Sequence, residues 1–305
     1  MDNNPLVSII VPSYKRKKEM VGRAIQSLLD QTYKNIEIVL VDDNGKDELV
    51  DYRNGLQELV LSINSKNLVY IKNDVNLGGS LTRNRGIEAS KGLLITFLDD
   101  DDMYEPDKIS HQVQYMLANN LEVCISDLSI YDEKDRLIDY RDHKDIKSFD
   151  REYLFKYHLT KQIAGTPTFM FKADVLRKIG GFEDAVTAQE YYLISKTILS
   201  GANIGYFPES NIRAYRYDIE AISTGKGKII GEKKLYAYKK QFFDILTFSE
   251  RNYVKCRHYA VMAVAYRRNK KYLKCIANLF VAFFLNPLLS IQEALNLNKR
   301  KKEKK

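Results

Sequence analysis

The sequence has few cysteines, and this scarcity argues against two kinds of stabilising site. Its cysteines are Cys124, Cys256 and Cys275, an odd number at wide spacing. They form no CxxC pair and no His cluster accompanies them, so neither a zinc site nor a disulfide framework is indicated. Reduced thiols of this kind are typical of a cytoplasmic protein. Tryptophan is absent too, but its absence excludes no class of function.

No stretch of the sequence has the pattern of a targeting or membrane-spanning segment. Residues 1–5 lead directly into an apolar run, without a basic region followed by a long apolar one, so we expect no signal peptide. The most apolar late stretch, 276–289, is interrupted by Asn278 and by Asn286-Pro287 and is too short to cross a bilayer. We therefore expect a cytoplasmic location.

Two common phosphate-binding loops are also missing. No GxGxxG follows the first apolar run, 6–11, which argues against an NAD-type dinucleotide site. The sequence contains no GxxxxGK[ST] loop either, so a P-loop nucleotide site is not indicated.

The composition is that of an ordinary globular protein, with 45% apolar and 29% charged residues over 305 positions. This length suits one large domain plus an appendage. Much of the formal net charge of +8 comes from the tail 298–305. That distribution argues against a nucleic-acid binder with a uniformly basic surface, and it favours a basic end that contacts something anionic.

The first hundred residues alternate between buried strands and helices. Apolar runs at 6–11, 36–41, 68–71 and 93–98 have the near-continuous hydrophobicity of strands covered on both faces. The segments between them have apolar residues at helical spacing. This order predicts an α/β fold with a mostly parallel sheet and right-handed crossovers.

Polar residues gather where these strands end. The first strand leads into Pro12-Ser13-Tyr14, the second into Asp42-Asp43, and the fourth into the four aspartates 99–102. In an open α/β sheet, ligands bind at the carboxyl ends of the strands. Four adjacent carboxylates repel one another, and Mg²⁺ or Mn²⁺, which prefer oxygen ligands, would relieve that repulsion. The alternative is a solvated acidic turn that caps the next helix.

Taken together and in order, these motifs resemble family 2 glycosyltransferases of the GT-A fold. The resemblance rests on residues 7–14, on 37–43, on Asn76-Leu77-Gly78-Gly79 with Arg83-Asn84, and on the aspartates with Pro106, and it covers roughly residues 6–210. Members of the family transfer a sugar from a nucleotide donor, often a UDP-sugar, with inversion at the anomeric carbon. The resemblance therefore implies a nucleotide-sugar donor and a hydroxyl acceptor.

The resemblance also assigns roles to single residues. It implies that the nucleotide is bound by six residues: Pro12, Tyr14, Asp43, Arg83, Asp99 and Asp100. Asp43 matches the acid that bonds the base edge, and Tyr14 lies where an aromatic face stacks on the base. Asp101 matches the acid that holds Mn²⁺ or Mg²⁺. A cation there would stabilise the charge on the leaving diphosphate. For Arg83 the alternative is a surface salt bridge.

The expected general base is Glu190. In the family an acid follows a Gly-Gly-Phe-Asp/Glu stretch, and here the chain has Gly180-Gly181-Phe182-Glu183 and then Gln189-Glu190. Glu190 stands where Asp is usual, but a carboxylate of either length accepts the proton of a hydroxyl group. The alternative is that Glu190 only favours the N-terminus of its helix. Residues 215–218 contain no His, so no further metal ligand is expected there.

Two other functions fit parts of the pattern. A sugar nucleotidyltransferase also needs a nucleotide, a metal and acids at strand ends, but it usually has a Gly-rich loop after the first strand, where this chain has Pro12-Ser13-Tyr14. A non-catalytic module that binds nucleotide sugars or glycans would keep the fold without the chemistry. Its only support is the change from Asp to Glu at position 190.

We expect residues 1–228 to form the GT-A catalytic domain, with a nucleotide-binding half at about 1–106 and an acceptor half at about 107–228. Residues 229–297 should form a helical extension, and 298–305 a basic tail. Apolar helices flanked by Lys and Arg favour peripheral contact with the inner face of the cell membrane. The alternative is a helical cap. Acceptors of such enzymes are carbohydrates or lipid-linked sugars, as in bacterial surface polysaccharide, teichoic acid or glycolipid synthesis.

Overall fold

The computed structural model describes residues 4–47, 49–163, 165–185, 187–217 and 226–291. The chain contacts divide it into two units, each described separately. Unit 1 comprises Met1–Leu154, Ile163–Asp184 and Gln189–Tyr217, and unit 2 comprises Phe155–Gln162, Ala185–Ala188 and Asp218–Lys305. The boundary expected near residue 228 follows 218–225, which lie outside the described residues, as does the basic tail 298–305.

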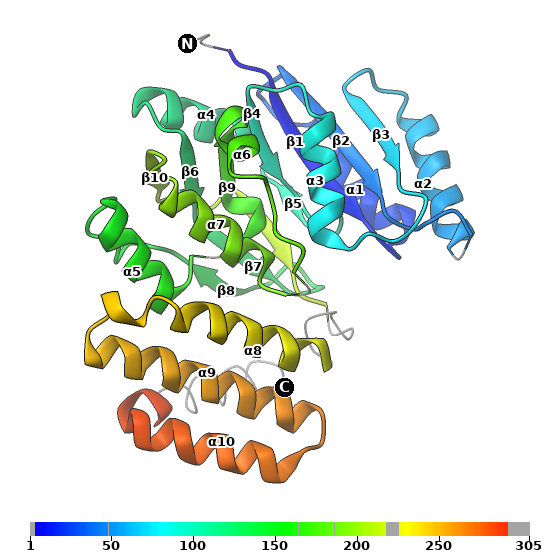
Figure 1. The fold of residues 1–305 in the computed structure, drawn as a ribbon. Helices are drawn as coiled ribbons and strands as arrows, with labels where there is room; N and C mark the ends of the chain where they lie inside the picture. Colours follow the sequence, from blue (N-terminus) through cyan, green and yellow to red (C-terminus); the bar gives the residue numbers. More distant parts are fainter. Residues whose placement is uncertain (1–3, 48, 164, 186, 218–225, 292–305) are drawn as a thin grey trace. The chain divides into compact units, whose positions relative to one another are not determined.

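A seven-stranded sheet forms the centre of unit 1 (Figure 1). In the order in which they lie, its strands are β10 (Ile204–Phe207), β6 (Val123–Ser126), β9 (Phe169–Lys172), β4 (Leu94–Phe97), β1 (Val7–Ser13), β2 (Ile36–Asp42) and β3 (Leu68–Lys72). Every pair is parallel except the two that β9 makes with β4 and β6. The prediction of an α/β fold with a mostly parallel sheet is therefore confirmed.

A second, four-stranded sheet contains β5 (Met103–Tyr104), β11 (Ile212–Tyr215), β7 (Leu128–Tyr131) and β8 (Leu137–Arg141), in that order. The β7 and β8 strands form an antiparallel hairpin in the charged segment after residue 131. The sequence predicts one helix over residues 103–119, and this prediction is wrong at its start. Met103 and Tyr104 pair with Arg213 and Ile212 instead, and the helix begins only after Pro106.

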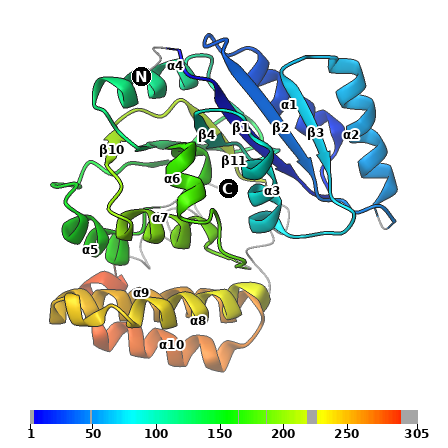
Figure 2. The ribbon, with the colours of Figure 1, turned by 45° about the horizontal axis from the view of Figure 1, so that its top comes forward.

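The helices of unit 1 lie beside the larger sheet (Figure 1). They are α1 (Lys18–Leu29), α2 (Val50–Ile63), α3 (Gly79–Ala89), α4 (Lys108–Ala118), α6 (Ala173–Lys178) and α7 (Gln189–Leu199). A further helix, α5 (Arg151–Lys161), begins in unit 1 and continues in unit 2. Figures 1 and 2 show α3 alongside β1 and β2, against which it packs. This contact is so close that a Cβ at Gly86 would lie 2.4 Å from Cγ2 of Ile10. Only glycine fits there, and α3 carries Arg83 at this fixed distance from the sheet.

In unit 2, the described residues 226–291 form three long helices, α8 (Lys226–Lys240), α9 (Phe248–Arg268) and α10 (Tyr272–Leu285). A capping box starts α9, because Thr247 and Glu250 each accept a hydrogen bond from the other's backbone N–H. The α9 and α10 helices pack along each other, and Met262, Tyr266 and Cys275 belong to a small apolar core. Among the described residues, no helix is both long and apolar enough to cross a membrane.

Candidate active site

The polar ends of three strands lie side by side at one edge of the larger sheet. The β1 strand lies between β4 and β2, with Ser13 opposite Asp42 in the parallel register. The chain after β4 continues along β1, because the N–H of Leu98 donates to the carbonyl oxygen of Ile10. The convergence expected from the sequence is therefore confirmed, and it places the four aspartates next to the end of β1.

The loops after β1 and β2 hold the residues expected to receive the nucleobase. Pro12 pairs with Val41 inside the sheet, and Tyr14 follows it in a half-buried position. The carboxylate of Asp43 is buried and already accepts four hydrogen bonds, from Nδ2 of Asn73 and Asn76 and from the backbone N–H groups of Leu77 and Gly78. Each oxygen accepts two of them, so the bonds fill the usual acceptor positions of a carboxylate. Asp43 therefore fixes the loop that leads into α3.

The four consecutive aspartates point in different directions. Asp99 pairs with Arg83 at 2.5 Å. Asp100 accepts hydrogen bonds from Ser13 Oγ at 2.7 Å and from Arg16 Nε at 2.9 Å. The same guanidinium pairs with Asp101 at 2.7 Å. Asp102 accepts a hydrogen bond from the backbone N–H of Tyr215 at 2.8 Å.

Burial and repulsion between neighbouring charges make Asp100, Asp101 and Asp102 hard to ionise. Burial raises the pKa of Asp101 to about 7, with further increases from Asp100 and Asp99, although Arg16 opposes the shift. The pKa of Asp100 is raised as well, chiefly by burial, and Arg16 and Ser13 oppose this shift. Burial, and then the charges of Asp99 and Asp101, raise the pKa of Asp102 well above its usual range. The loop is thus a site where added positive charge would be stabilising.

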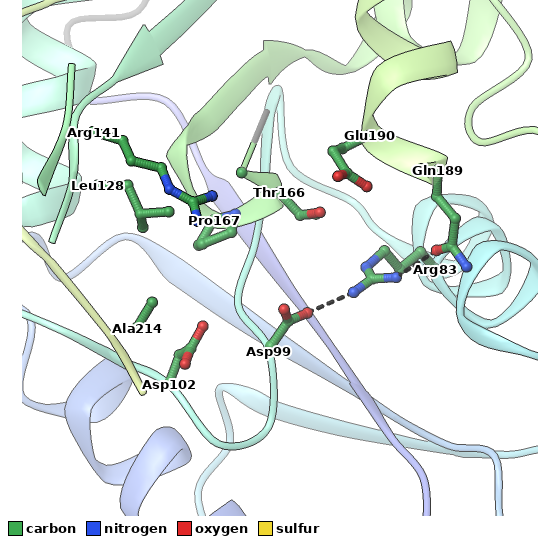
Figure 3. A pocket seen from close by; sticks show the side chains of 11 residues that line it. Arg83, Asp99, Asp102, Leu128, Arg141, Thr166, Pro167, Gln189, Glu190 and Ala214 are labelled. Atoms are coloured by element: carbon green, nitrogen blue, oxygen red, sulfur yellow. Dashed lines mark hydrogen bonds and ion pairs between the residues drawn. The ribbon is translucent and has the colours of Figure 1, made fainter. Parts of the chain in front are cut away.

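A pocket of about 280 Å³ lies beside this loop (Figure 3). Its lining side chains come from α3, from the acid loop, from the β7–β8 hairpin, from the 165–167 turn, from β11 and from the start of α7. Arg83 crosses one side of it and donates hydrogen bonds to Asp99 and to Oε1 of Gln189. Of the residues predicted for the site, Arg83, Asp99 and Glu190 line this pocket. Pro12, Tyr14, Asp43, Asp100 and Asp101 do not, and lie in the loops after β1, β2 and β4.

Two charged side chains in the pocket carry no hydrogen bond within the described part of the chain. The Glu190 carboxylate, in the first turn of α7, has neither a hydrogen-bond nor an ion-pair partner there. Arg141, the last residue of β8, has one ion pair, in which its Nε lies 3.5 Å from Oδ2 of Asp139. The sequence predicts acceptor contacts in the charged segment 132–150, in the 165–167 turn and in the C-terminal segment. It does not single out Arg141, since nothing in the pattern distinguishes it from its neighbours.

The described residues contain no group of three or more His, Cys, Asp or Glu side chains arranged to hold a metal ion. A cation at the acid loop would therefore need ligands from a bound substrate in addition to the protein. This is compatible with a single protein acid that holds Mg²⁺ or Mn²⁺ together with phosphate oxygens and water.

Comparison with known proteins identifies the family. The sequence profile described as "Glycosyl transferase family 2" matches residues 8–180, more than half of the chain. The chain belongs to this family. The resemblance expected from the motifs is therefore confirmed, and the matched segment includes the three polar strand ends and Arg83, while Glu190 lies ten residues beyond it.

Curated relatives of this family 2 member cover only part of it. An uncharacterised glycosyltransferase of Methanocaldococcus jannaschii is 27% identical over 193 residues, which are 62% of this chain and 63% of that protein. The Escherichia coli protein named UDP-Glc:alpha-D-GlcNAc-diphosphoundecaprenol beta-1,3-glucosyltransferase WfaP is 37% identical over 133 residues, 44% of this chain and 49% of that one. The chain thus spans 63% of the first relative and 49% of the second, less than two thirds of the length of each.

Solved structures share the GT-A fold with this family 2 member. Staphylococcus aureus TarS 1-349 in complex with UDP-GlcNAc has a TM-score of 0.60 at 16% identity, with 91% of each chain covered. The mannosyltransferase PcManGT from Pyrobaculum calidifontis, in complex with GDP-Man and Mn²⁺, has a TM-score of 0.53 at 16% identity, with 96% of this chain and 81% of that one covered. At this identity the likeness establishes the fold.

Proposed function

We propose that this protein transfers a sugar from a nucleotide-sugar donor to a hydroxyl group of an acceptor, with inversion at the anomeric carbon. The observation that carries the proposal is that the side chain of Glu190 lines the pocket without a partner among the described residues. Its carboxylate has no partner in the described chain, while the nearby Asp99 and Arg83 are held by each other. A free carboxylate in a pocket of a family 2 glycosyltransferase is well suited to accept a proton.

The donor is proposed to lie along the ends of β1, β2 and β4. Tyr14 offers an aromatic face to the base next to Pro12, and Asp43 shapes the loop at 76–78 around it. Direct contact between Asp43 and the base edge stays a prediction, and it would require one of the four present hydrogen bonds to be exchanged. Arg83, Asp99 and Asp100 are assigned to the ribose and diphosphate. A UDP-sugar is favoured, because TarS was solved with UDP-GlcNAc and the name of WfaP gives UDP-Glc.

The acid loop fits a divalent cation in its chemistry. Its ligand atoms are carboxylate oxygens, which Mn²⁺ and Mg²⁺ prefer, and its crowded acids would be stabilised by added positive charge. We assign the metal to Asp101, and the Mn²⁺ in the PcManGT complex supports such a cofactor at the level of the fold. When bound, the cation stabilises the charge that develops on the departing nucleoside diphosphate.

The proposed reaction is a direct displacement. The acceptor oxygen forms a bond to the anomeric carbon as the bond from that carbon to the donor phosphate oxygen breaks. The hydroxyl proton moves to Glu190, and the electron pair of the broken bond leaves with the nucleoside diphosphate. Arg83 is already held by Asp99 and Gln189, so its charge is positioned near the phosphates without reorganisation during the step.

The acceptor is proposed to be a carbohydrate or a lipid-linked sugar in bacterial surface polysaccharide, teichoic acid or glycolipid synthesis. The printed name of WfaP, which gives a diphosphoundecaprenol-linked acceptor, supports a lipid-linked one. On this proposal, residues 1–228 form the catalytic domain, with donor and acceptor halves that meet near residue 106, and 229–297 form the extension.

We also propose that the extension touches the inner face of the cell membrane. One face of α10 exposes six large apolar side chains: Leu273, Ile276, Leu279, Phe280, Phe283 and Phe284. Residues 226–291 contain 14 Lys and Arg against 3 Asp and Glu, a net charge of +11, whereas 1–217 contain 28 against 33, a net charge of −5. An apolar helix face on a basic unit suits an anionic lipid surface.

The test is a panel of nucleotide sugars, with and without Mn²⁺, measured first by thermal shift and then by product analysis. We expect one nucleotide family to raise the Tm in a Mn²⁺-dependent manner, and the matching sugar donor to release a nucleoside diphosphate. Release of pyrophosphate from a nucleoside triphosphate would indicate a nucleotidyltransferase instead. Binding of the donor without any transfer or hydrolysis would indicate a non-catalytic module.

A further inference from the structure

The hairpin residue Arg141 and the proposed base Glu190 line the same pocket, and they are its two charged groups without a hydrogen bond in the described chain. Figure 3 shows Arg141 and Leu128 on the side of the pocket opposite Arg83 and Gln189. The two arginines of the pocket therefore differ in how many partners their guanidinium groups already have. The guanidinium of Arg83 is held by Asp99 and Gln189, and that of Arg141 has both terminal amino groups available.

The backbone around Arg141 is firmly held. Arg141 pairs with Leu128 at the end of the antiparallel hairpin. The preceding residue, Tyr140, donates its hydroxyl to Oδ2 of Asp127 at 2.6 Å, and Tyr206 of β10 donates to Oδ1 of the same carboxylate. Asp127 is fully buried. This bridge ties the hairpin to an edge strand of the larger sheet, so the position of Arg141 is set by the fold.

We propose that Arg141 binds an anionic group of the acceptor, a phosphate or a carboxylate, close to the hydroxyl group that Glu190 deprotonates. This inference rests on the proposed function and names the acceptor class of the same site. A guanidinium presents donors in a planar fork that matches both anions. The ion pair with Asp139 uses only Nε, and it leaves the fork directed at the pocket. The proposed site of the donor phosphates lies at the acid loop, where Arg83 and Arg16 pair with Asp99, Asp100 and Asp101 and already supply positive charge.

The experiment compares the full chain with R141Q, which removes the charge, and R141K, which keeps it. The matched control is K134Q, because Lys134 is an exposed cation of the same hairpin that does not line the pocket. Three probes present a hexose as a neutral methyl glycoside, as a methyl hexuronide or as a hexose 1-phosphate. Binding of each probe is measured by NMR with UDP and Mn²⁺ at saturation, and again without nucleotide. Donor hydrolysis without acceptor is measured in parallel.

We expect R141Q to weaken binding of the hexose 1-phosphate or the hexuronide by about tenfold or more, the size that loss of a hydrogen bond to a charged group produces. R141K should retain part of this binding. The neutral glycoside, donor hydrolysis and K134Q should change by less than about twofold. The anionic probe that responds distinguishes a phosphate-bearing acceptor from a uronic acid.

Equal binding of both anionic probes by wild type and R141Q would overturn the inference. So would a slower donor hydrolysis or a higher donor KM in R141Q, since that would place Arg141 on the donor. If the wild type neither binds a nucleotide nor hydrolyses a donor, the proposed function fails. The nucleotide-free binding arm still decides whether Arg141 holds an anion.

Discussion

The guanidinium of Arg83 pairs with the carboxylate of Asp99 across one side of the pocket. Asp99 comes directly after a buried strand, and Arg83 comes from a helix held against the sheet by Gly86. The pair therefore joins two elements whose separation is fixed, and it presents one positive charge at the acid loop.

Replacement of Arg83 by Lys should lower kcat/KM for the donor by about 10- to 100-fold, because a lysine cannot bridge Asp99 and Gln189 at once. The free energy of unfolding should change little by comparison. Steady-state kinetics with the donor varied will measure the effect, with R85K as the control, since Arg85 is on the same helix but contacts Asn73. An equal decrease of kcat/KM in R83K and R85K would indicate that both substitutions disturb α3.

Replacement of Glu190 by Gln should reduce transfer by about 10²- to 10⁴-fold, the usual contribution of a general base, and leave nucleotide binding intact. Transfer assays and nucleotide thermal shifts provide the two readouts. E183Q is a suitable control, because Glu183 pairs with Lys196 and does not line the pocket. Normal turnover by E190Q would move the base elsewhere.

Replacement of Asp101 by Ala should remove the Mn²⁺-dependent part of the Tm increase that a donor produces, and should abolish transfer. The fold should persist, because Arg16 keeps its hydrogen bond to Asp100. Circular dichroism and thermal shift with and without Mn²⁺ will check both statements. An unchanged metal response in D101A would remove Asp101 from the cation site.

Stability should depend on pH through Lys108, whose fully buried Nζ donates to Oγ1 of Thr96 at 2.9 Å. Burial lowers the pKa of this ammonium group well below 10.5. Between the folded and unfolded pKa values the unfolded chain binds one more proton, so the free energy of unfolding rises with pH, by up to about 1.4 kcal/mol per unit. At pH values below the folded pKa both states are protonated, and this increase in the free energy of unfolding is absent.

Denaturant unfolding of wild type and K108M at pH 7 and 8.5 will measure this slope. The Met variant should show a smaller rise across the interval, because it has no proton to bind in either state. Identical slopes in the two proteins would contradict the assignment.

Serine at Leu273, Phe280 and Phe284 together should reduce binding to anionic vesicles by more than about tenfold, since each large apolar side chain contributes roughly 1.5 to 3 kcal/mol when buried. Vesicle sedimentation at two salt concentrations will measure it, and binding of the wild type should fall as salt rises. L61S is the control, because Leu61 is 78% exposed in unit 1. If the triple variant binds as the wild type does, α10 is not the contact.

The sequence predicted the first four strands, their order along the chain and the convergence of their polar ends, because these follow from local hydrophobic runs and the geometry of β-α units. Residues 122–130 have the pattern of one strand, but they divide at Asp127 into β6 and β7, which belong to different sheets. The sequence also did not predict that β9 inserts antiparallel between β4 and β6. Both depend on pairing between residues far apart in the sequence, which no local period records.

The same limit applies to the site. Glu190 and Arg83 were found because they lie in motifs with a fixed order along the chain. Arg141 was not found, because only its pairing with Leu128 in the hairpin brings it to the pocket. The sequence also did not predict the four hydrogen bonds to the Asp43 carboxylate, since their donors lie in a loop some thirty residues later.

The antiparallel strand β9 has a consequence for the order in which the chain assembles during synthesis. The first four strands of the larger sheet are complete by residue 97, but β6 contacts them only through β9, which ends at Lys172. A nascent chain shorter than this has β4 and β6 as unpaired sheet edges, and such edges are prone to aggregation. The emergence of residues 169–172 is therefore the event that lets β6 join the first four strands of the larger sheet.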